Sequence, residues 1–224
     1  MVKKLGILFS GGKDSMYAAW LAKKEGYKIS CLISIVSENE ESYMFHTPSI
    51  RRVEEQAKSM GIPLIIVKTK GKKEKELIDL EKSIKLAIKD YDIEGVISGA
   101  VESVYQASRI EKICNKLKIA CFNPLWQKNQ LELLKDLIKN KFEVIVVGVF
   151  AYPFDEKWLG RKIDTKFINE IKKLQEKYKI NVAGEGGEFE SFVLNCSLFK
   201  KRLKIKDKKI KGSKNSWRMD IKLE

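Results

Sequence analysis

Histidine is nearly absent from this chain, with one His among 224 residues, so a metal site built from several histidines is excluded. The four cysteines (Cys31, Cys114, Cys121 and Cys196) are widely spaced. Without a Cys-x-x-Cys pair, there is no zinc-ribbon pattern and no local redox motif, and we expect buried free thiols. Long apolar runs are also missing, and the N-terminus carries no long hydrophobic leader, which predicts a cytoplasmic protein without a membrane partner.

Arginine is scarce as well: six of the 44 basic residues are Arg, and the others are Lys. The net charge of +14 suggests nucleic-acid binding at first sight. More than half of this excess lies in residues 199–224, where 11 basic and 3 acidic residues give +8. Because enrichment in Lys, Glu and Ile is also typical of thermophile surfaces, we favour a solvated lysine-rich surface, and nucleic-acid binding stays the alternative.

Short apolar segments alternate with amphipathic ones from the start of the chain. The expected strands are residues 5–9, 28–36, 64–67 and 95–98, and the expected helices are 16–22, 48–60, 74–89 and 101–117. Repeated strand–helix units predict an α/β fold with a doubly wound parallel sheet. Ligands of such sheets bind at the carboxyl ends of the strands, close to the point where the strand order reverses.

The second part of the chain has a different pattern, which predicts a smaller C-terminal α+β domain after a boundary at residue 124. Helices are expected at 131–138 and 167–178, and strands at 144–150 and 189–194. The tail alternates apolar and polar residues on both sides of Gly212-Ser213, which predicts an antiparallel hairpin with outward lysines. The exposed edge of that hairpin could pair two subunits in a homo-oligomer.

The segment Ser10–Ser15 reads Ser-Gly-Gly-Lys-Asp-Ser and lies between an expected strand and an expected helix. Two glycines allow a tight turn whose N–H groups point to one spot, and the helix N-terminus adds its positive dipole end. Lys13 adds a full charge. The segment is not a Walker A loop, because the spacing from Gly6 and the residue after Lys13 both differ. It predicts a binding site for a polyphosphate or pyrophosphate.

A second unusual segment, Gly184–Ser191, reads Gly-Glu-Gly-Gly-Glu-Phe-Glu-Ser. Its three carboxylates lie within six residues and repel one another, and two adjacent glycines carry an entropy cost. A bound cation such as Mg²⁺ or ammonium, or a ligand close to the backbone, would explain the segment. An exposed acidic turn before a strand would explain it equally well, and the residues alone leave both interpretations open.

The six residues Ser10–Ser15 resemble the PP-loop of the ATP pyrophosphatase superfamily without a departure. Members of that superfamily cleave ATP between the α and β phosphates and transfer AMP to an oxygen of the substrate. Over essentially its whole length the chain is similar to one branch, the diphthine–ammonia ligase family. The matching segments are Gly184–Glu190, His46-Thr47-Pro48, Gly99 with Tyr105-Gln106 and Arg109, Pro124-Leu125-Trp126 and Trp158-Leu159-Gly160.

The resemblance implies a fold of the HUP/PP-loop type and an AMP-forming, ATP-dependent amide ligase. Its expected protein substrate is translation elongation factor 2, on which ammonia would convert diphthine to diphthamide through an acyl-adenylate. ATP and Mg²⁺ are the expected cofactors, with residues 1–124 as the ATP-binding domain and residues 125–224 on the substrate side. A PP-loop enzyme that adenylates and modifies a tRNA base is the alternative, which the basic tail favours and the acidic motif opposes.

The resemblance also implies roles for individual residues. The expected ATP-binding residues are Ser10, Gly11, Gly12, Lys13, Asp14, Ser15 and Gly99, and the expected catalytic residues are Lys13, Asp14 and Glu188. Substrate or ammonium binding is expected of His46, Tyr105, Arg109, Glu185, Gly186, Gly187, Glu188 and Glu190. Helix packing is the alternative for Tyr105 and Arg109. The sequence identifies no metal ligands, ammonia source or general base.

Overall fold

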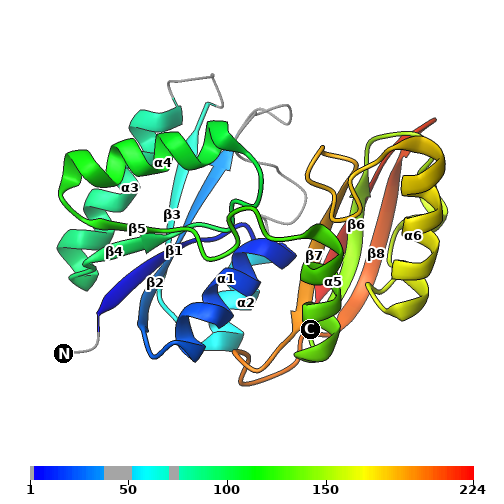
Figure 1. The fold of residues 1–224 in the computed structure, drawn as a ribbon. Helices are drawn as coiled ribbons and strands as arrows, with labels where there is room; N and C mark the ends of the chain where they lie inside the picture. The colour runs from blue at the N-terminus through cyan, green and yellow to red at the C-terminus, as the bar shows by residue number, and fades with distance from the viewer. Residues whose placement is uncertain (1–2, 38–51, 71–75) are drawn as a thin grey trace. The chain divides into compact units, whose positions relative to one another are not determined.

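The computed structural model describes residues 3–37, 52–70 and 76–224. The chain divides into two compact units, Met1–Trp126 and Gln127–Glu224 (Figure 1). The boundary predicted from the sequence lies two residues earlier, at residue 124. Among the described helices, none has the length and apolar character needed to cross a membrane.

The first unit contains a five-stranded parallel sheet in the order β3-β2-β1-β4-β5. Its strands are β1 (Lys4–Leu8), β2 (Lys28–Ser37), β3 (Leu64–Thr69), β4 (Gly95–Ile97) and β5 (Ala120–Phe122). The predicted α/β fold with a parallel sheet is therefore confirmed. The sequence analysis missed β5, because three residues are too few to show a periodic pattern.

The helices of the first unit are α1 (Lys13–Lys24), α2 (Val53–Met60), α3 (Glu76–Tyr91) and α4 (Val104–Leu117). Helices α3 and α4 pack on one face of the sheet, with Leu80, Ile84 and Ile110 in a shared core, and α1 and α2 lie on the other face (Figure 1). The predicted start of α4 at residue 101 was wrong, because the Ser103 hydroxyl caps the helix by accepting a hydrogen bond from the Gln106 N–H. The predicted helix start at Pro48 lies outside the described residues.

The second unit contains a four-stranded antiparallel sheet in the order β7-β6-β9-β8. Its elements are α5 (Gln130–Lys139), β6 (Glu143–Val149), a short 3₁₀ helix (Glu156–Trp158), α6 (Thr165–Tyr178), β7 (Phe189–Asn195), β8 (Ile205–Ser213) and β9 (Ser216–Leu223). A smaller C-terminal region of helices and an antiparallel sheet is thus confirmed.

The C-terminal hairpin of β8 and β9 was predicted correctly, but its turn was misplaced. Ser213 pairs with Ser216, so Lys214 and Asn215 form the turn, and Gly212 lies within β8. Gly212 has a φ of 151°, and the Ser216 carbonyl oxygen occupies the space that a Cβ would need. Glycine is required there by a close backbone approach within the ladder, not by the turn. Every residue of β8 is exposed, as predicted for its lysines.

Candidate functional site

The strand order of the first unit reverses between β1 and β4, because β2 and β3 extend the sheet on one side of β1 and β4 and β5 extend it on the other. A reversal of this kind leaves a crevice at the carboxyl ends of the two strands, where ligands of α/β sheets bind. The Ser10–Ser15 loop follows β1, and Gly99 follows β4. The topology therefore brings two segments predicted from the sequence to one place.

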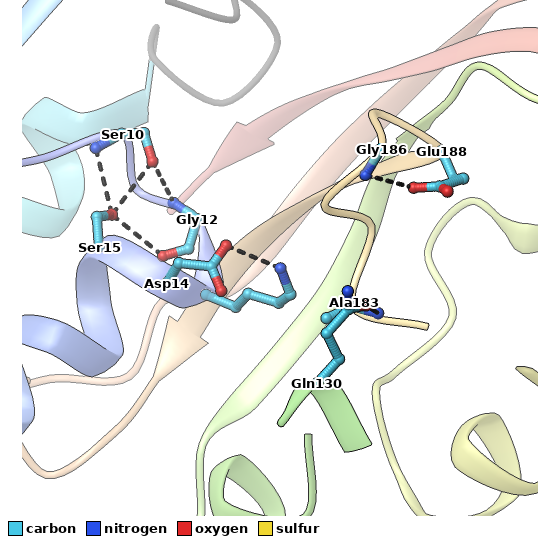
Figure 2. A network of polar contacts seen from close by, with 9 residues as sticks. Ser10, Gly12, Asp14, Ser15, Gln130, Ala183, Gly186 and Glu188 are labelled. Atoms are coloured by element: carbon cyan, nitrogen blue, oxygen red, sulfur yellow. Dashed lines mark hydrogen bonds and ion pairs between the residues drawn. The ribbon is translucent and has the colours of Figure 1, made fainter. Parts of the chain in front are cut away.

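Two serines hold the Ser10–Ser15 loop in shape (Figure 2). The Ser15 hydroxyl donates to the Gly12 carbonyl oxygen at 3.2 Å and accepts from the Ser10 N–H at 3.3 Å. The two hydroxyls lie 3.2 Å apart, and the Gly12 N–H donates to the Ser10 hydroxyl at 3.4 Å. Sequence analysis predicted these hydroxyls as phosphate contacts, and the structure gives them an additional part in fixing the loop.

Gly11 makes the turn of the loop possible, because its φ of 78° is a conformation that side chains other than glycine strain to adopt. The fully buried Gln56 of α2 donates from Nε2 to the Gly11 carbonyl oxygen at 3.0 Å, and its amide oxygen occupies the space of a Gly11 Cβ. Sequence analysis did not single out Gln56. A polar residue between Val53 and Met60 on the apolar face of α2 was the available signal.

The N-terminus of α1 differs from those of α4, α5 and α6 in its capping residue. Ser103, Asn129 and Asp164 cap those three helices with side-chain oxygens, but the N-cap of α1 is Gly12, which has none. No side chain of the N-cap residue therefore competes with an anion for the first N–H groups of α1. Together with the helix dipole, this arrangement suits a phosphate group.

Lys13 and Asp14 form an ion pair at the start of α1, with 2.8 Å between Lys13 Nζ and Asp14 Oδ2 (Figure 2). Lys13 is buried, whereas the Asp14 side chain is one-quarter exposed. The second carboxylate oxygen, Asp14 Oδ1, is buried and has no hydrogen-bond partner among the residues that the structure describes. A buried carboxylate oxygen in this position can accept a cation or an ordered water.

The residues present fit a nucleotide-bound Mg²⁺ better than a metal ion in a protein cage. Within the described ranges, three or more His, Cys, Asp or Glu residues nowhere gather into a metal-binding group. Mg²⁺ usually takes one or two carboxylates from the protein and completes its shell with phosphate oxygens and water. Asp14 Oδ1 would supply that protein ligand.

Gly99 lies directly against the first turn of α1. A Cβ at Gly99 would be 2.7 Å from the Ser15 backbone N and 2.8 Å from the Asp14 carbonyl carbon. The neighbouring Ser98 is buried and accepts a hydrogen bond from the Ala100 N–H at 3.1 Å, which fixes the loop after β4. The backbone of α1 thus requires glycine here, and a contact between Gly99 and a nucleotide stays a prediction.

Tyr105 and Arg109 lie one turn apart on α4, as their spacing predicted. The Arg109 guanidinium stacks on the Tyr105 ring at 3.5 Å from its centre, and the guanidinium Nη1 also donates to the Tyr105 carbonyl oxygen at 3.5 Å. Their part in substrate binding stays a prediction. His46 lies outside the described residues.

In the second unit, the Glu188 carboxylate links two parts of the acidic loop, which comprises residues 181–188 before β7. Glu188 is buried, and its Oε1 accepts from the Asn181 N–H at 2.8 Å. Its Oε2 accepts from the Gly186 N–H at 2.9 Å (Figure 2). These two backbone donors offset the repulsion of the Glu188 carboxylate from the neighbouring acidic residues. Both oxygens are thus engaged by the loop itself, and ammonium handling by Glu188 stays a prediction.

Gln130, the first residue of α5, connects this helix to the same loop. Its Oε1 accepts from the Ala183 N–H at 3.0 Å (Figure 2). Its Nε2 donates to Asn181 Oδ1 at 2.9 Å. Sequence analysis missed Gln130, because its partners lie 51 and 53 residues further along the chain. The loop is therefore held from α5 as well as by its own Glu188.

An aromatic cluster accounts for the phenylalanine between the two glutamates. Phe189 is buried against Phe154 and Phe167, with ring centres 6.0 and 5.7 Å away, and Trp158 completes the cluster. Gly184 has a φ of 79°, and a Cβ there would be 2.8 Å from the Phe189 carbonyl oxygen. Trp158 packs against Phe154 and Phe167 in this cluster.

All four cysteines are free thiols, as predicted, and Cys121 is half-buried whereas the other three are buried. Burial raises the pKa of Cys31 to about 12. A hydrogen bond between the thiols of Cys114 and Cys121 raises the pKa of Cys114 and lowers the pKa of Cys121. Sequence analysis missed this pair, because α4 and β5 bring together two cysteines that are seven positions apart.

Replacing Glu188 with Gln is expected to destabilise the second unit. The amide would keep one acceptor but turn an NH₂ group toward the other backbone N–H, which leaves a buried donor without a partner. We expect the free energy of unfolding, measured with urea, to fall by about 1–3 kcal/mol. Glu176→Gln, at an exposed position on α6, is the control and should change it by less than about 0.5 kcal/mol.

Equal stability of the Glu188→Gln and control variants would contradict the structural role. Turnover measured on the same protein also tests the role predicted from the sequence. An unchanged KM for ammonia together with an unchanged kcat would exclude Glu188 from ammonium handling.

Both units match known sequence families. Residues 3–121 match the family described as diphthamide synthase N-terminal domain, and residues 129–223 match diphthamide synthase C-terminal domain. The diphthine–ammonia ligase of Rattus norvegicus is 33% identical over 221 residues, covering 90% of this chain and 82% of that protein. The corresponding protein of Homo sapiens is 32% identical over 219 residues, covering 89% and 82%.

Among solved structures, a predicted subunit of tRNA methyltransferase from Methanocaldococcus jannaschii is similar over 90% of this chain and 100% of its own. Its identity to this chain is 20% and the TM-score is 0.44. A similarity of this degree indicates no function.

Proposed function

Because the chain belongs to the diphthamide synthase family, we propose that it is a diphthine–ammonia ligase. The reaction would convert the carboxylate of diphthine on translation elongation factor 2 to an amide, with ATP and ammonia as co-substrates and AMP and pyrophosphate as products. The observation that carries the proposal is the match of both units to relatives with this name, at 32–33% identity over about nine-tenths of the chain.

The first unit would activate the carboxylate. A carboxylate oxygen of diphthine attacks the α-phosphorus of ATP, the bond between the α and β phosphates breaks, and pyrophosphate leaves with the electron pair. The N–H groups at the start of α1 and the Lys13 ammonium stabilise the negative charge that grows on the pyrophosphate. Mg²⁺, held by Asp14 and the phosphates, would supply further neutralisation of that charge.

The second unit would bind ammonium for the second step, in which ammonia attacks the acyl-adenylate. A free carboxylate resists attack by ammonia, whereas the acyl-adenylate offers AMP as a leaving group. Ammonia attacks the acyl carbon, the amide forms and AMP departs. We assign substrate and ammonium binding to the segment Gly184–Glu190 and further substrate contacts to His46, Tyr105 and Arg109. Since the protein substrate is a translation factor, we expect the enzyme to work in the cytoplasm.

The test uses translation elongation factor 2 arrested at diphthine. This factor is incubated with the protein, ATP, Mg²⁺ and ammonium, and AMP release and the mass of the modified peptide are followed. We expect AMP together with the mass change from carboxylate to amide, and no amide when ammonium is omitted. A factor that already carries diphthamide is the matched control and should release no AMP above background.

A folded, ATP-binding protein that releases no AMP and changes no mass would contradict the proposal. The same assay with tRNA as the acceptor separates the alternative, because an enzyme that modifies a tRNA base would release AMP with tRNA and not with the factor.

A further inference from the structure

Three adjacent strands of the second unit place Glu190, Gly148 and Arg218 in one row. Glu190 of β7 pairs with Gly148 of β6, and Gly148 pairs with Arg218 of β9. Directly paired residues of an antiparallel sheet carry their side chains on the same face. Because Gly148 has no side chain, none stands between the side chains of Glu190 and Arg218 on that face.

An aromatic ring covers the glycine between the two charged groups. A Cβ at Gly148 would be 2.6 Å from Phe150 Cζ and 3.4 Å from Glu190 Oε2. The Arg218 guanidinium lies 5.1 Å from the centre of the Phe150 ring. A carboxylate, a guanidinium and an aromatic ring thus lie around one glycine of the sheet, where a Cβ would displace the Phe150 ring.

Burial at this position raises the pKa of the Glu190 carboxyl group. The pKa rises to about 7, and the positive charge of Arg218 opposes that rise. Glu190 therefore changes its protonation state close to neutral pH. Glu188, two residues earlier on the chain, instead accepts two backbone N–H groups.

Other charged groups lie near this row without acting on Glu190 as Arg218 does. On β9 the next residue on the same face is Asp220, which pairs with Lys209 of β8, and Arg218 itself pairs with Lys211. Gly148 of β6, which pairs with Glu190, and Phe150, which follows the end of β6, are uncharged. Within the described residues, Arg218 is the group whose charge shifts the pKa of Glu190.

We infer that Glu190 accepts the proton of ammonium and that Arg218, which lies across Gly148 from Glu190, is its positioning residue. This inference rests on the proposed function. One N–H proton of ammonium passes to the Glu190 carboxylate, and the nitrogen lone pair forms a bond to the acyl carbon. The bond from that carbon to the AMP oxygen breaks with its electron pair on AMP, and the nitrogen loses a second proton to solvent.

The test measures the pH dependence of amide formation in Arg218→Gln, Arg218→Lys and the wild-type protein. Removing the positive charge raises the pKa of Glu190, so less of it is ionised at neutral pH. In Arg218→Gln, we expect the acidic limb of the profile of rate against pH to shift to higher pH by on the order of one unit. The rate of amide formation should recover at still higher pH. Arg218→Lys keeps the charge and should stay close to the wild type.

Arg202→Gln is the matched control, because it removes an arginine of the same unit from an exposed ion pair with Glu143. It should leave the acidic limb unmoved. The inference would be overturned if the acidic limb of the rate profile does not shift in Arg218→Gln, or if it shifts equally in Arg202→Gln. It would also be overturned if Arg218→Gln lowers the rate by the same factor at every pH.

A second measurement separates the inference from the proposed function. Carbon-13 NMR of labelled glutamate carboxyls, with Glu190→Gln to assign the signal, follows the titration of Glu190 without any turnover. We expect a midpoint near neutral pH that rises in Arg218→Gln, in samples whose thermal unfolding shows that they are folded. If the wild type amidates diphthine but the midpoint does not rise, the inference is wrong. If the midpoint rises but nothing is amidated, the proposed function is wrong.

The same Glu190→Gln protein tests the proton-acceptor role. In the amidation assay at neutral pH, it should form amide at least about 100-fold more slowly than the wild type. A rate within threefold of the wild type would exclude Glu190 as the acceptor.

Discussion

Lys13→Met is expected to lower the rate of AMP formation about 10²- to 10³-fold. Lys13 is buried at the start of α1, in the loop that the sequence predicts for pyrophosphate, and its charge stabilises the departing group most when the phosphate bond breaks. The unbranched methionine keeps much of the aliphatic stem and removes the charge. Because the interaction strengthens in the transition state, kcat should fall more than the KM for ATP rises.

The measurement is AMP release at saturating ATP with the diphthine form of the factor. Lys24→Met is the control, since Lys24 lies on the same helix, is exposed and has its ammonium 5.0 Å from the centre of the Trp20 ring. It should retain kcat within about twofold. A Lys13→Met protein with kcat within threefold of the wild type would remove Lys13 from the catalytic residues.

Gly99→Ala has the second large expected effect. The added Cβ would be 2.7 Å from the Ser15 backbone N and 2.8 Å from the Asp14 carbonyl carbon, and backbone atoms yield less readily than a side chain. The loop after β4 and the first turn of α1 must separate, which displaces the N–H groups that are predicted to bind phosphate. We expect the free energy of unfolding to fall by roughly 1–3 kcal/mol and kcat/KM for ATP to fall on the order of 10²-fold.

Urea unfolding and steady-state kinetics measure the two effects on the same protein. Gly26→Ala is the matched control, because nothing lies within 4 Å of a Cβ at that position, although its φ of 89° strains alanine. It should lose about 1 kcal/mol of stability and keep its kcat/KM for ATP. If Gly99→Ala uses ATP as well as Gly26→Ala does, the loop after β4 does not shape the ATP site.

Local features of the sequence predicted most of the secondary structure. The strand, glycine turn and helix around residues 5–22 were evident because neighbours along the chain determine period, capping and turn conformation. The prediction from local features placed the turn of the C-terminal hairpin wrongly at Gly212. Glycine is needed at that position because the Ser216 carbonyl oxygen on the opposite strand leaves no room for a Cβ. It also missed β5, whose three residues form a strand through pairing with β4.

The acidic segment Gly184–Ser191 shows more clearly what local sequence features cannot predict. The sequence reveals three carboxylates close together, and their repulsion argues for a bound cation. In the folded chain, the N–H groups of Asn181 and Gly186 donate hydrogen bonds to one of them, Glu188. These bonds offset part of the repulsion between the carboxylates without a bound cation. For another, Glu190, burial raises the pKa, and the charge of Arg218, 28 positions further along, opposes that rise.

By itself, the sequence determined that this chain has an α/β fold, and it predicted a phosphate-binding loop and the segments where the chemistry should be sought. The tertiary structure decided how the individual residues are placed there: that Gln56 holds the carbonyl of Gly11, that Gly99 makes room for α1, and that Glu190 and Arg218 both pair with Gly148. The reason is physical. Backbone conformation depends on near neighbours in the chain, whereas burial, hydrogen-bond partners and pKa depend on groups that only folding brings within a few ångströms.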